Sequence, residues 1–476
     1  MAAYGAAVSL KNTIQSLLES SRISLLPHSP EILRSAYDDM CRLQRVLLKL
    51  DEMGYSKIRT KVNALDERIK EVVWEFEDLL ESHYADQILP QLESKKDRLP
   101  FLVEMQSLQQ SIDRFIERMT VMEAEYEMEL LNMPEEEGEP LSSRIDFRGI
   151  NSNMVGLSEL LEGVRYFLLL GGEGESENAD AELKCLLLTG MAGVGKTTLV
   201  HKIFDDPSIH RHFEHRAWVK VGRKCESNET LRCILVQVEP NTHDQMLIQR
   251  EDKDDFEKLV GVLEDRLKDK KCLIVLDDVW QWDTRLMSTL QEKNVRILLT
   301  SRLRIEDSPL IAPVRLLDKE ESKRLLGAKV FVEKGFPPYL EELGEKIAQK
   351  CEGLPLMIVT VADLLRKANE GTGEELNKST QEYWTEVAET QQSSVFLDAY
   401  DQISDVFFPS YDYLPQILKM LFLYLGAFSP YTNIDPHDLM CCVSAEGFCE
   451  QIGKKKLDDE VMDGSTTKEY FVFALV

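Results

Sequence analysis

A chain of 476 residues is too long for a single compact core, so its length predicts about three domains. Hydrophobic residues make up 43% of the chain and charged residues 29%, a balance typical of globular proteins and not of disordered ones. The formal net charge of −28, together with the lack of any long lysine or arginine run, excludes nucleic acid as a main partner.

The nine cysteines are scattered along the chain and odd in number, which predicts reduced thiols in a cytoplasmic protein. Cys441, Cys442 and Cys449 lie near His437, but they lack the paired CxxC spacing of a zinc site, so we expect no zinc there. The longest apolar run, from Met420 to Phe428, is about half the length that a membrane span needs. We therefore expect no integral membrane span, and no secretory signal either.

Apolar residues at spacings of three and four predict helices in the first part of the chain. One such stripe consists of Val62, Leu65, Ile69, Val72, Phe76 and Leu79. A second consists of Leu102, Met105, Leu108, Ile112, Phe115, Met119 and Met122. With further helical patterns near 9–25 and 30–52, the sequence predicts a four-helix bundle with a coiled-coil-like seam over residues 1–132.

An acidic linker is predicted at 133–150, because Pro134 and Pro140 enclose a run of like charges and a glycine. A surface loop is predicted from Gly171 to Asp180. Short apolar runs then alternate with helical stretches, which predicts a parallel α/β sheet within 151–312 that is buried on both faces. The predicted strands are Cys185–Thr189, Arg216–Val221, Lys271–Leu276 and Arg296–Thr300. Helical patterns take over from Leu316 and predict a small helical domain at 313–390.

Residues Gly190 to Thr197 read GMAGVGKT and match the phosphate-binding pattern GxxxxGK[ST] in full. The pattern follows an apolar strand and precedes a helical run, as a P-loop requires. Its glycines let backbone N–H groups surround a phosphate, while Lys196 reaches the terminal phosphates and the Thr197 hydroxyl can bind Mg²⁺. The sequence therefore predicts a nucleotide site at this loop.

Two further strands end in charged residues that suit such a site. Asp277 and Asp278 follow the strand LIVL, and we assign Asp277 to Mg²⁺ and Asp278 to orienting the attacking water. Arg302 follows the strand ILLTS and is placed to sense a γ-phosphate. The alternatives are a surface carboxylate pair and a solvated arginine, and the P-loop favours the functional interpretation of the carboxylates.

The order of these motifs resembles that of plant coiled-coil NB-ARC disease-resistance proteins, most closely their late-blight-resistance-like branch. The motifs are GMAGVGKTT at 190–198, HF at 212–213 with RAWV at 216–219, LIVLDDVW at 273–280, LLTSR at 298–302 and GLPL at 353–356. The segments SYDYLP at 410–415, LFLYLGAF at 421–428 and AEGF at 445–448 are similar to the family's winged-helix motifs. The resemblance covers essentially the whole chain.

This resemblance implies a four-helix N-terminal domain, a P-loop α/β domain, a helical ARC1 domain at 313–390 and a partial winged-helix ARC2 domain at 391–476. In the family, ADP holds the receptor closed, and exchange for ATP opens it and lets copies assemble into a cell-death signal. The implied function is an ADP/ATP switch in plant defence and the hypersensitive response, with at most slow ATP hydrolysis. The implied location is cytoplasmic, with peripheral attachment to the plasma membrane on activation.

The resemblance also assigns roles to residues. It implies phosphate binding by Gly190, Gly193, Val194, Gly195, Lys196, Thr197 and Thr198, with a base-covering role for Val155 in the element MVGL. Arg302 matches the family's sensor arginine. Pro355 of GLPL would pack near adenine, although proline is also common in a first helical turn. Glu77, Asp78 and Glu81 occupy the place of an acidic interaction motif, for which a solvated helix face is the alternative.

Two departures from the family limit what carries over. The winged-helix His-Asp motif has no counterpart before Val476, and the first ten residues match poorly the membrane-acting helix of executor members. We therefore expect a truncated sensor-type receptor without leucine-rich repeats, whose partners are nucleotide and either other immune receptors or a second copy through the bundle. We expect no binding of a pathogen effector or guarded host protein, and we expect Leu421, Phe422 and Leu425 to have less surface to pack against.

Two alternatives stay open. The chain could be a nucleotide-independent adaptor that pairs with other receptors through its bundle. It could instead be a conventional P-loop NTPase, although we find neither an acceptor pocket nor an arginine-rich lid of the kind a kinase needs.

Overall fold

The computed structural model describes residues 3–94, 100–136, 154–170, 184–224, 226–238, 256–290, 294–305, 308, 310–331, 336–368, 374–390, 393–428 and 434–445. These residues form two compact units, one from Met1–Glu136 with Tyr411–Val476 and the other from Glu137–Ser410. The predicted multidomain fold of helical and α/β parts is confirmed. Within the described ranges no helix is both long and apolar enough to cross a membrane.

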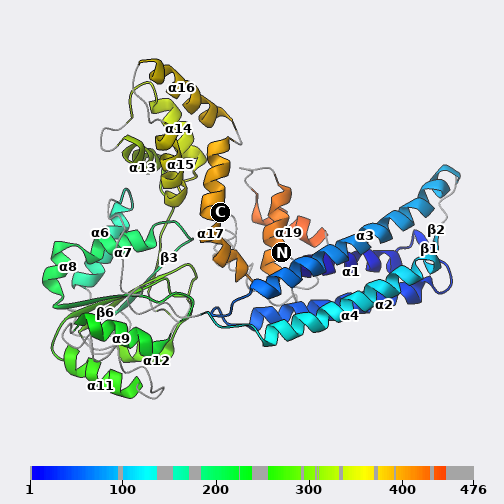
Figure 1. The fold of residues 1–476 in the computed structure, drawn as a ribbon, viewed down its shortest axis with the longest axis horizontal. Helices are drawn as coiled ribbons and strands as arrows, with labels where there is room; N and C mark the ends of the chain where they lie inside the picture. The colour runs from blue at the N-terminus through cyan, green and yellow to red at the C-terminus, as the bar shows by residue number, and fades with distance from the viewer. Residues whose placement is uncertain are drawn as a thin grey trace. The chain divides into compact units, whose positions relative to one another are not determined.

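The first unit contains the predicted four-helix bundle (Figure 1). Its helices are α1 (Ala3–Glu19), α2 (Ser29–Leu48), α3 (Thr60–Ser94) and α4 (Gln109–Leu131), with short 3₁₀ turns η1 (Lys49–Glu52) and η2 (Gln106–Leu108). On the seam, the ring of Phe76 in α3 stacks on Phe115 in α4 at a centroid distance of 4.2 Å. Val72, one turn earlier, is buried beside them. The apolar spacing therefore identified the core-facing side of α3 over most of its length.

Two details of the predicted stripes are wrong. Leu79 is 41% exposed, and Leu80 is buried in its place, because the helix period of 3.6 residues carries the stripe from Phe76 to Leu80. Leu102 belongs to no helix. It lies in strand β2 (Phe101–Val103), which pairs in parallel with β1 (Ile23–Leu25), so the first and last predicted helices of the bundle are shorter there than their patterns suggest.

Helices from the other end of the chain complete the core of the same unit. They are α18 (Gln416–Tyr424), η4 (Leu425–Ala427) and α19 (Pro436–Ala445). Met420 and Leu421 of α18 are buried with Leu439 and Val443 of α19 in one hydrophobic cluster with the bundle helices. The expected shortage of packing surface is wrong for Leu421 and Leu425, because the N-terminal bundle supplies that surface.

A buried arginine joins the two stretches of this unit. Arg59, only 5% exposed, donates hydrogen bonds to the carbonyl oxygens of Asp412 (3.0 Å) and Met53 (3.3 Å). Its guanidinium lies 4.1 Å from the centre of the Tyr413 ring. The Tyr413 hydroxyl in turn donates to the carbonyl of Lys57 at 2.6 Å. Residues far apart in sequence are thus fixed by polar contacts as well as by apolar packing.

A carboxylate of the bundle also caps a C-terminal helix. The backbone N–H of Gln416, at the start of α18, donates to both carboxylate oxygens of Asp51 at 3.0 and 3.1 Å. Such capping satisfies a helix N–H that has no partner within its own helix. Burial raises the pKa of Asp51, and burial likewise lowers the pKa of Arg59. The boundary between the units, at Ser410 and Tyr411, lies inside the range 391–476 that we predicted as one domain.

The second unit is built on a five-stranded parallel sheet with the order β4-β5-β6-β3-β7. The strands are β3 (Cys185–Thr189), β4 (His215–Lys220), β5 (Cys272–Asp277), β6 (Val295–Ser301) and β7 (Ile311–Pro313). Four of them were predicted to within one residue at each end. The fifth, β7, escaped prediction because three residues ending in proline give no strand pattern.

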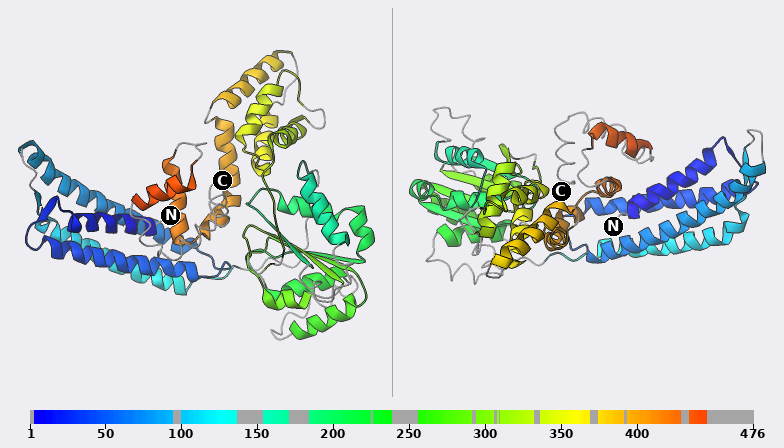
Figure 2. Two further views of the ribbon diagram at one scale, coloured as in Figure 1. Left: turned by 180° about the vertical axis from the view of Figure 1, so that it is seen from behind. Right: turned by 90° about the horizontal axis from the view of Figure 1, so that it is seen from above.

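Helices cover both faces of this sheet (Figure 2). They are α6 (Ser158–Leu170), α7 (Lys196–Phe204), α8 (Pro207–His212), α9 (Ser227–Val238), α11 (Phe256–Leu267) and α12 (Thr284–Leu290). Alternate residues of β5, such as Ile274 and Leu276, pack in one hydrophobic cluster with α9, α11 and α12. Every residue of β3 and β5 is buried, as expected for central strands with helices on each side.

Helices follow the sheet in sequence, as the pattern after Leu316 predicted. They are α13 (Lys319–Phe331), α14 (Glu341–Lys350), α15 (Pro355–Ala368), α16 (Glu374–Glu389) and α17 (Ser394–Asp412). The fully buried Trp384 packs against Phe331 and Phe336 and organises this helical part. The predicted loop at 171–180, most of the linker, and residues 446–448 of AEGF lie outside the described residues.

Candidate nucleotide-binding site

The P-loop joins the end of β3 to the start of α7, and its glycines adopt backbone angles that other residues avoid. Gly193 has φ +77° and Gly195 has φ +98°, both in the left-handed region. A Cβ atom at Gly193 would lie 2.7 Å from Cβ of Leu356, so a side chain has no room there. At Gly195 the space is open and only the backbone angle requires glycine. At these two positions the loop therefore presents backbone, and not side chains, to its surroundings.

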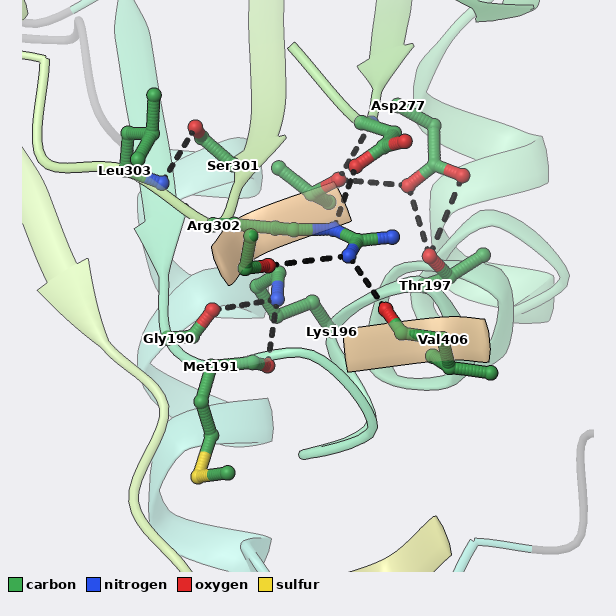
Figure 3. A network of polar contacts seen from close by, with 12 residues as sticks. Gly190, Met191, Lys196, Thr197, Asp277, Ser301, Arg302, Leu303 and Val406 are labelled. Carbon is green, nitrogen blue, oxygen red and sulfur yellow. Dashed lines mark hydrogen bonds and ion pairs between the residues drawn. The ribbon is translucent and has the colours of Figure 1, made fainter. Parts of the chain in front are cut away.

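Lys196 is buried and folded back onto its own loop (Figure 3). Its Nζ donates to the carbonyl oxygens of Gly190 at 2.6 Å and Met191 at 2.8 Å. Burial, with repulsion from Arg302 as the second cause, lowers the pKa of Lys196 to about 8. A cation held in this way would gain from a nearby anion, because an opposite charge favours the protonated form.

A chain of hydroxyls and carboxylates lies beside the P-loop. The Thr197 hydroxyl donates to Oδ1 of Asp277 at 2.9 Å, and the Thr300 hydroxyl donates to the same oxygen at 2.6 Å. The backbone N–H of Asp278 donates to the Thr300 hydroxyl at 2.9 Å. Burial raises the pKa of Asp277. Thr197 and Asp277 thus place at one point the kind of oxygen ligands that Mg²⁺ prefers.

Asp278 directly follows β5 and has an unusual backbone conformation. Its φ of +56° lies in the left-handed region, which aspartate tolerates better than most residues but which still costs energy. Such strain is concentrated at functional sites when the surroundings enforce it. Here the conformation places the carboxylate beside Arg302, whose Nε lies 3.4 Å from Oδ1.

Arg302 follows β6 and reaches a helix far along the chain. Its Nη1 donates to the carbonyl oxygen of Val406 at 2.7 Å and to the hydroxyl of Ser410 at 3.2 Å, both on α17 (Figure 3). Its guanidinium also lies 5.3 Å from the centre of the Trp280 ring. The side chain that was predicted to sense phosphate therefore connects Asp278 to α17.

The GLPL segment is seated on the P-loop. The backbone N–H of Leu356 donates to the carbonyl oxygen of Gly193 at 3.2 Å, and Pro355 begins α15. Gly353 has φ +78°, and a Cβ there would lie 2.2 Å from the carbonyl oxygen of Leu317. The Leu317 N–H donates back to the Gly353 carbonyl at 2.9 Å. The sequence motif thus corresponds to a tight backbone junction beside the phosphate loop.

A cavity of about 430 Å³ opens at this junction, within the size range of small-molecule sites. Its polar lining includes Lys196, Thr197, Thr198, Asp277, Asp278, Thr300 and Arg302. Its apolar lining includes Met154, Val155, Leu157, Leu317, Leu325, Pro355, Leu356 and Val359. Gly193, Val194 and Gly195 lie between them. A nucleotide needs both kinds of surface, one for its phosphates and one for its base, so the residues present fit this ligand.

The structure collects nearly all the predicted nucleotide residues around this cavity. Gly190 does not line it, but its carbonyl holds Lys196. Thr300 lines the cavity and Glu321 lies behind its lining, and neither was predicted from the sequence. Thr300 carried a weak signal as a polar residue ending a buried strand. Glu321 carried a clearer one, because Asp318 and Glu321 have the D-x-x-E spacing of a capping box.

The predicted acidic interaction motif lies elsewhere, on α3. Glu77 accepts hydrogen bonds from the hydroxyls of Ser9 and Thr13 on α1, each at 2.9 Å, and burial raises its pKa. Asp78 and Glu81 are exposed. Glu77 therefore contributes to packing within the bundle, and the interaction role of the motif stays a prediction.

Metal ligands do not gather elsewhere in the part of the chain that the structure describes. There, no group of three or more histidine, cysteine, aspartate or glutamate side chains is arranged to hold an ion. Cys441 lies 3.7 Å from Nδ1 of His437 on α19, and Cys449 falls outside the described residues.

Comparison with known proteins supports nucleotide binding at this site. Residues 175–335 match the NB-ARC domain family. The late blight resistance protein homolog R1B-16 of Solanum demissum is 31% identical over 322 residues, which are 65% of this chain and 23% of that protein. Residues 175–335 thus form an NB-ARC domain, and the chain is similar to plant disease-resistance proteins. A protein of Arabidopsis thaliana that is named as a disease resistance protein is 29% identical over 317 residues, which are 63% of this NB-ARC chain and 34% of that protein.

The NB-ARC chain thus spans about a quarter to a third of the length of these two relatives. Among solved structures, the FIGL-1 AAA domain in complex with ADP is similar at 13% identity, with a TM-score of 0.32 over 57% of this chain and 98% of that one. A likeness of this degree supports no argument about the chain.

Proposed function

We propose that this NB-ARC chain is an ADP/ATP-dependent switch in plant immunity, in which the bound nucleotide controls conformation. The observation that carries the proposal is the position of Arg302. Its Nε donates to the carboxylate of Asp278 beside the P-loop, and its Nη1 donates to the carbonyl oxygen of Val406 and the hydroxyl of Ser410 on α17.

A ligand shifts a conformational equilibrium only if it interacts differently with the two states. ATP differs from ADP by one further phosphate and its negative charge. Arg302 is a cation that lines the cavity, and it is bound to neutral groups of α17 that a phosphate would outcompete electrostatically. Contacts between Arg302 and α17 therefore give the third phosphate a direct means of altering the helical part of this unit.

The site residues divide the work of binding. The P-loop from Gly190 to Thr198 would hold the phosphates, with Lys196 as their cation. Thr197 and Asp277 would hold Mg²⁺, which neutralises phosphate charge when bound. Val155 and Pro355 lie among the apolar lining and would contact the base. These assignments agree with the hydrogen bonds that already fix Lys196, Thr197 and Asp277.

We propose that hydrolysis is slow and serves to reset the switch. Asp278 is the candidate for orienting water, and its carboxylate is engaged with Arg302. A conventional P-loop enzyme is the competing proposal, and turnover distinguishes the two. Kinases commonly turn over at about 1 to 100 per second, whereas a switch of this kind should complete at most a few turnovers per hour.

The immune role follows from the family. We propose a function in defence and the hypersensitive response, in the cytoplasm, with peripheral contact with the plasma membrane on activation. Other immune receptors or a second copy of the chain would be partners through the bundle. A nucleotide-independent adaptor is the alternative, and it predicts that loss of nucleotide leaves partner binding intact.

Native mass spectrometry of the nucleotide that co-purifies with the chain tests the proposal. The wild type should carry ADP, and Lys196→Arg should lose it, because the planar guanidinium cannot replace a compact ammonium in the loop. Lys202→Arg, on the exposed side of the same helix, is the matched control and should retain ADP. Equal ADP occupancy in wild type and Lys196→Arg would contradict the assignment.

Hydrogen exchange tests the switch itself. Exchange in residues 394–410 of α17 should differ between the protein with ADP and the protein with a non-hydrolysable ATP analogue. Arg302→Gln should abolish the difference, whereas Arg304→Gln, an exposed neighbour, should preserve it. A difference that persists in Arg302→Gln would show that another contact transmits the nucleotide state.

A further inference from the structure

The segment 154–157 lines the apolar part of the cavity and has a strained backbone. Met154, Val155 and Leu157 are lining residues, and Gly156 and Leu157 have φ angles of +83° and +58°. For a leucine this conformation is unfavourable, and it persists only where its surroundings enforce it. Some contact must therefore hold this segment in place.

Glu321 of α13 makes that contact. Its Oε1 accepts a hydrogen bond from the backbone N–H of Leu157 at 3.1 Å. The carboxylate also accepts from Arg315, with Oε2 2.7 Å from Nη1 and Oε1 3.1 Å from Nη2, and from the backbone N–H of Asp318 at 3.0 Å. These donors, Arg315 first, lower the pKa of Glu321 to about 2, so it stays charged at any physiological pH.

Close packing reinforces the contact. A Cβ atom at Gly156 would lie 2.7 Å from Cδ of Glu321 and 2.8 Å from Cδ2 of Leu317. The segment is therefore pressed against the start of α13, with no space for any residue larger than glycine at its centre.

The helix that holds this segment also lines the cavity itself. Leu325 and Lys329, one helical turn apart on α13, are lining residues, as is Leu317 just before the helix. Glu321, one turn before Leu325, is buried behind them. The first turns of α13 and the segment 154–157 thus form one wall of the cavity, joined through a single carboxylate.

We propose that Glu321 is a positioning residue for the bound nucleotide, which fixes segment 154–157 against the base and so links nucleotide retention to α13. The proposal rests on the proposed nucleotide-binding function. Glu321 need not touch the ligand; it acts through the Leu157 N–H, and Arg315 orients its carboxylate.

A positioning role for Glu321 predicts different effects on two ligands, whereas a role in general stability predicts the same effect on both. Inorganic pyrophosphate resembles the phosphate part of ADP but has no base. Loosening segment 154–157 should therefore weaken ADP binding and leave pyrophosphate binding unchanged. A variant that merely damages the fold should weaken both ligands together.

The test measures release of a fluorescent ADP analogue from the full chain, and pyrophosphate affinity by competition. Glu321→Gln should release ADP about tenfold faster, as expected for weakening one charge-assisted hydrogen bond. Glutamine still serves in a capping box, so the start of α13 should survive. Gly156→Ala, which separates the same two groups from the other side, should have the same effect. Glu320→Gln, the exposed neighbour on α13, is the matched control and should behave as wild type.

Faster ADP release in Glu321→Gln and Gly156→Ala, with unchanged pyrophosphate affinity, supports the proposal. Unchanged ADP release in both variants overturns it, and so does an equal loss of ADP and pyrophosphate. A wild-type chain that binds neither ligand overturns the proposed function and this inference together. A wild type that binds both, with variants that match it, overturns only the inference.

Discussion

Two arginines, one in each compact unit, are held in different ways: Arg59 is buried and Arg302 is half-buried. Arg59 in the bundle unit donates to the carbonyl oxygens of Met53 and Asp412 and is covered by the ring of Tyr413. Arg302 in the nucleotide-binding unit has a longer contact with the Asp278 carboxylate and faces a cavity of about 430 Å³.

This difference indicates that Arg59 is a structural cation, whereas Arg302 is available to a ligand. Burying an isolated charge is costly, so the surroundings must compensate with hydrogen bonds and opposite charges. Around Arg59 that compensation comes from residues of the same unit, and the side chain is only 5% exposed. Around Arg302 and Lys196 the cavity leaves room for further negative charge. Removing the first kind should damage the fold, and removing the second should damage function.

The largest effect should come from breaking the bundle core. Val72→Glu with Phe76→Glu places two charges on the seam, where Phe76 stacks on Phe115. Each buried charge should cost several kcal/mol, against a total stability of about 5 to 15 kcal/mol. Thermal unfolding of the full chain by circular dichroism should lose the transition of the bundle unit. Trp74→Glu is the matched control on the same helix, because Trp74 is 50% exposed. Equal melting of all three proteins would show that the seam is not a core.

A smaller loss of stability is expected when Arg59 is replaced. Arg59→Met keeps much of the apolar volume but leaves the carbonyls of Asp412 and Met53 without their donor, which should cost about 3 kcal/mol. Residues 411–445 should become sensitive to limited proteolysis while bound ADP is retained. Arg45→Met, on an exposed position of α2, should change neither. Loss of bound ADP in Arg59→Met would contradict the proposal that Arg59 has only a structural role and that Arg302 serves the ligand.

The reverse pattern is expected at Asp278. Asp278→Asn preserves shape and tolerance for the left-handed conformation but removes the charge that would orient water. General-base groups commonly contribute about a hundredfold or more, so single-turnover ATP hydrolysis should slow by about that factor. Thermal stability and ADP occupancy should stay near those of the wild type. Unchanged hydrolysis would move the water-orienting role to another residue.

Short-range patterns account for what the sequence could predict here. The strand boundaries of β3 and β5 follow from unbroken apolar runs, and the P-loop follows from glycine spacing that only a phosphate loop needs. These features depend on residues that are close together in the sequence, so the sequence alone predicts them. The burial of Leu80 in place of Leu79 also depends only on neighbouring residues. It was mispredicted because the helix period of 3.6 residues allows a step of either three or four from Phe76.

The contacts that were missed join residues far apart in sequence. No local pattern indicates that Asp51 caps a helix beginning at Gln416, or that Leu421 packs in the N-terminal core. Arg302 was recognised as a cation at a strand end, but its partners on α17 depend on the tertiary fold. Glu321 was detectable as half of a capping box, whereas its bond to Leu157 was not. Predicting the chemistry of the site was thus easier than predicting how the helical part is attached to it.

The smallest expected effect is a pH dependence that arises from Lys196 in the nucleotide-binding unit. The pKa of Lys196 is lowered to about 8 by burial, below the 10.5 of an exposed lysine. Between those values the unfolded chain binds more protons at this residue, so its contribution makes the fold more stable as pH rises. Nucleotide binding should show the opposite trend. Phosphate favours charged Lys196, so ADP affinity should be full below pH 8 and fall as pH rises through it.

From pH 7 to pH 9 the fall in affinity should be about tenfold, the change in the protonated fraction of a group with a pKa of 8. The phosphate's own second ionisation, with a pKa of about 6, is nearly complete at pH 7 and contributes little. Isothermal titration at each pH measures the affinity, and buffers of different ionisation enthalpy reveal the proton taken up at pH 9. Residual binding by Lys196→Arg should not vary over this range, since arginine stays charged. An ADP affinity that does not change between pH 7 and pH 9 in the wild type would mean that Lys196 stays protonated over this range. The loop carbonyls would then stabilise its charge without a nucleotide, as the carbonyls of Met53 and Asp412 stabilise the charge of Arg59.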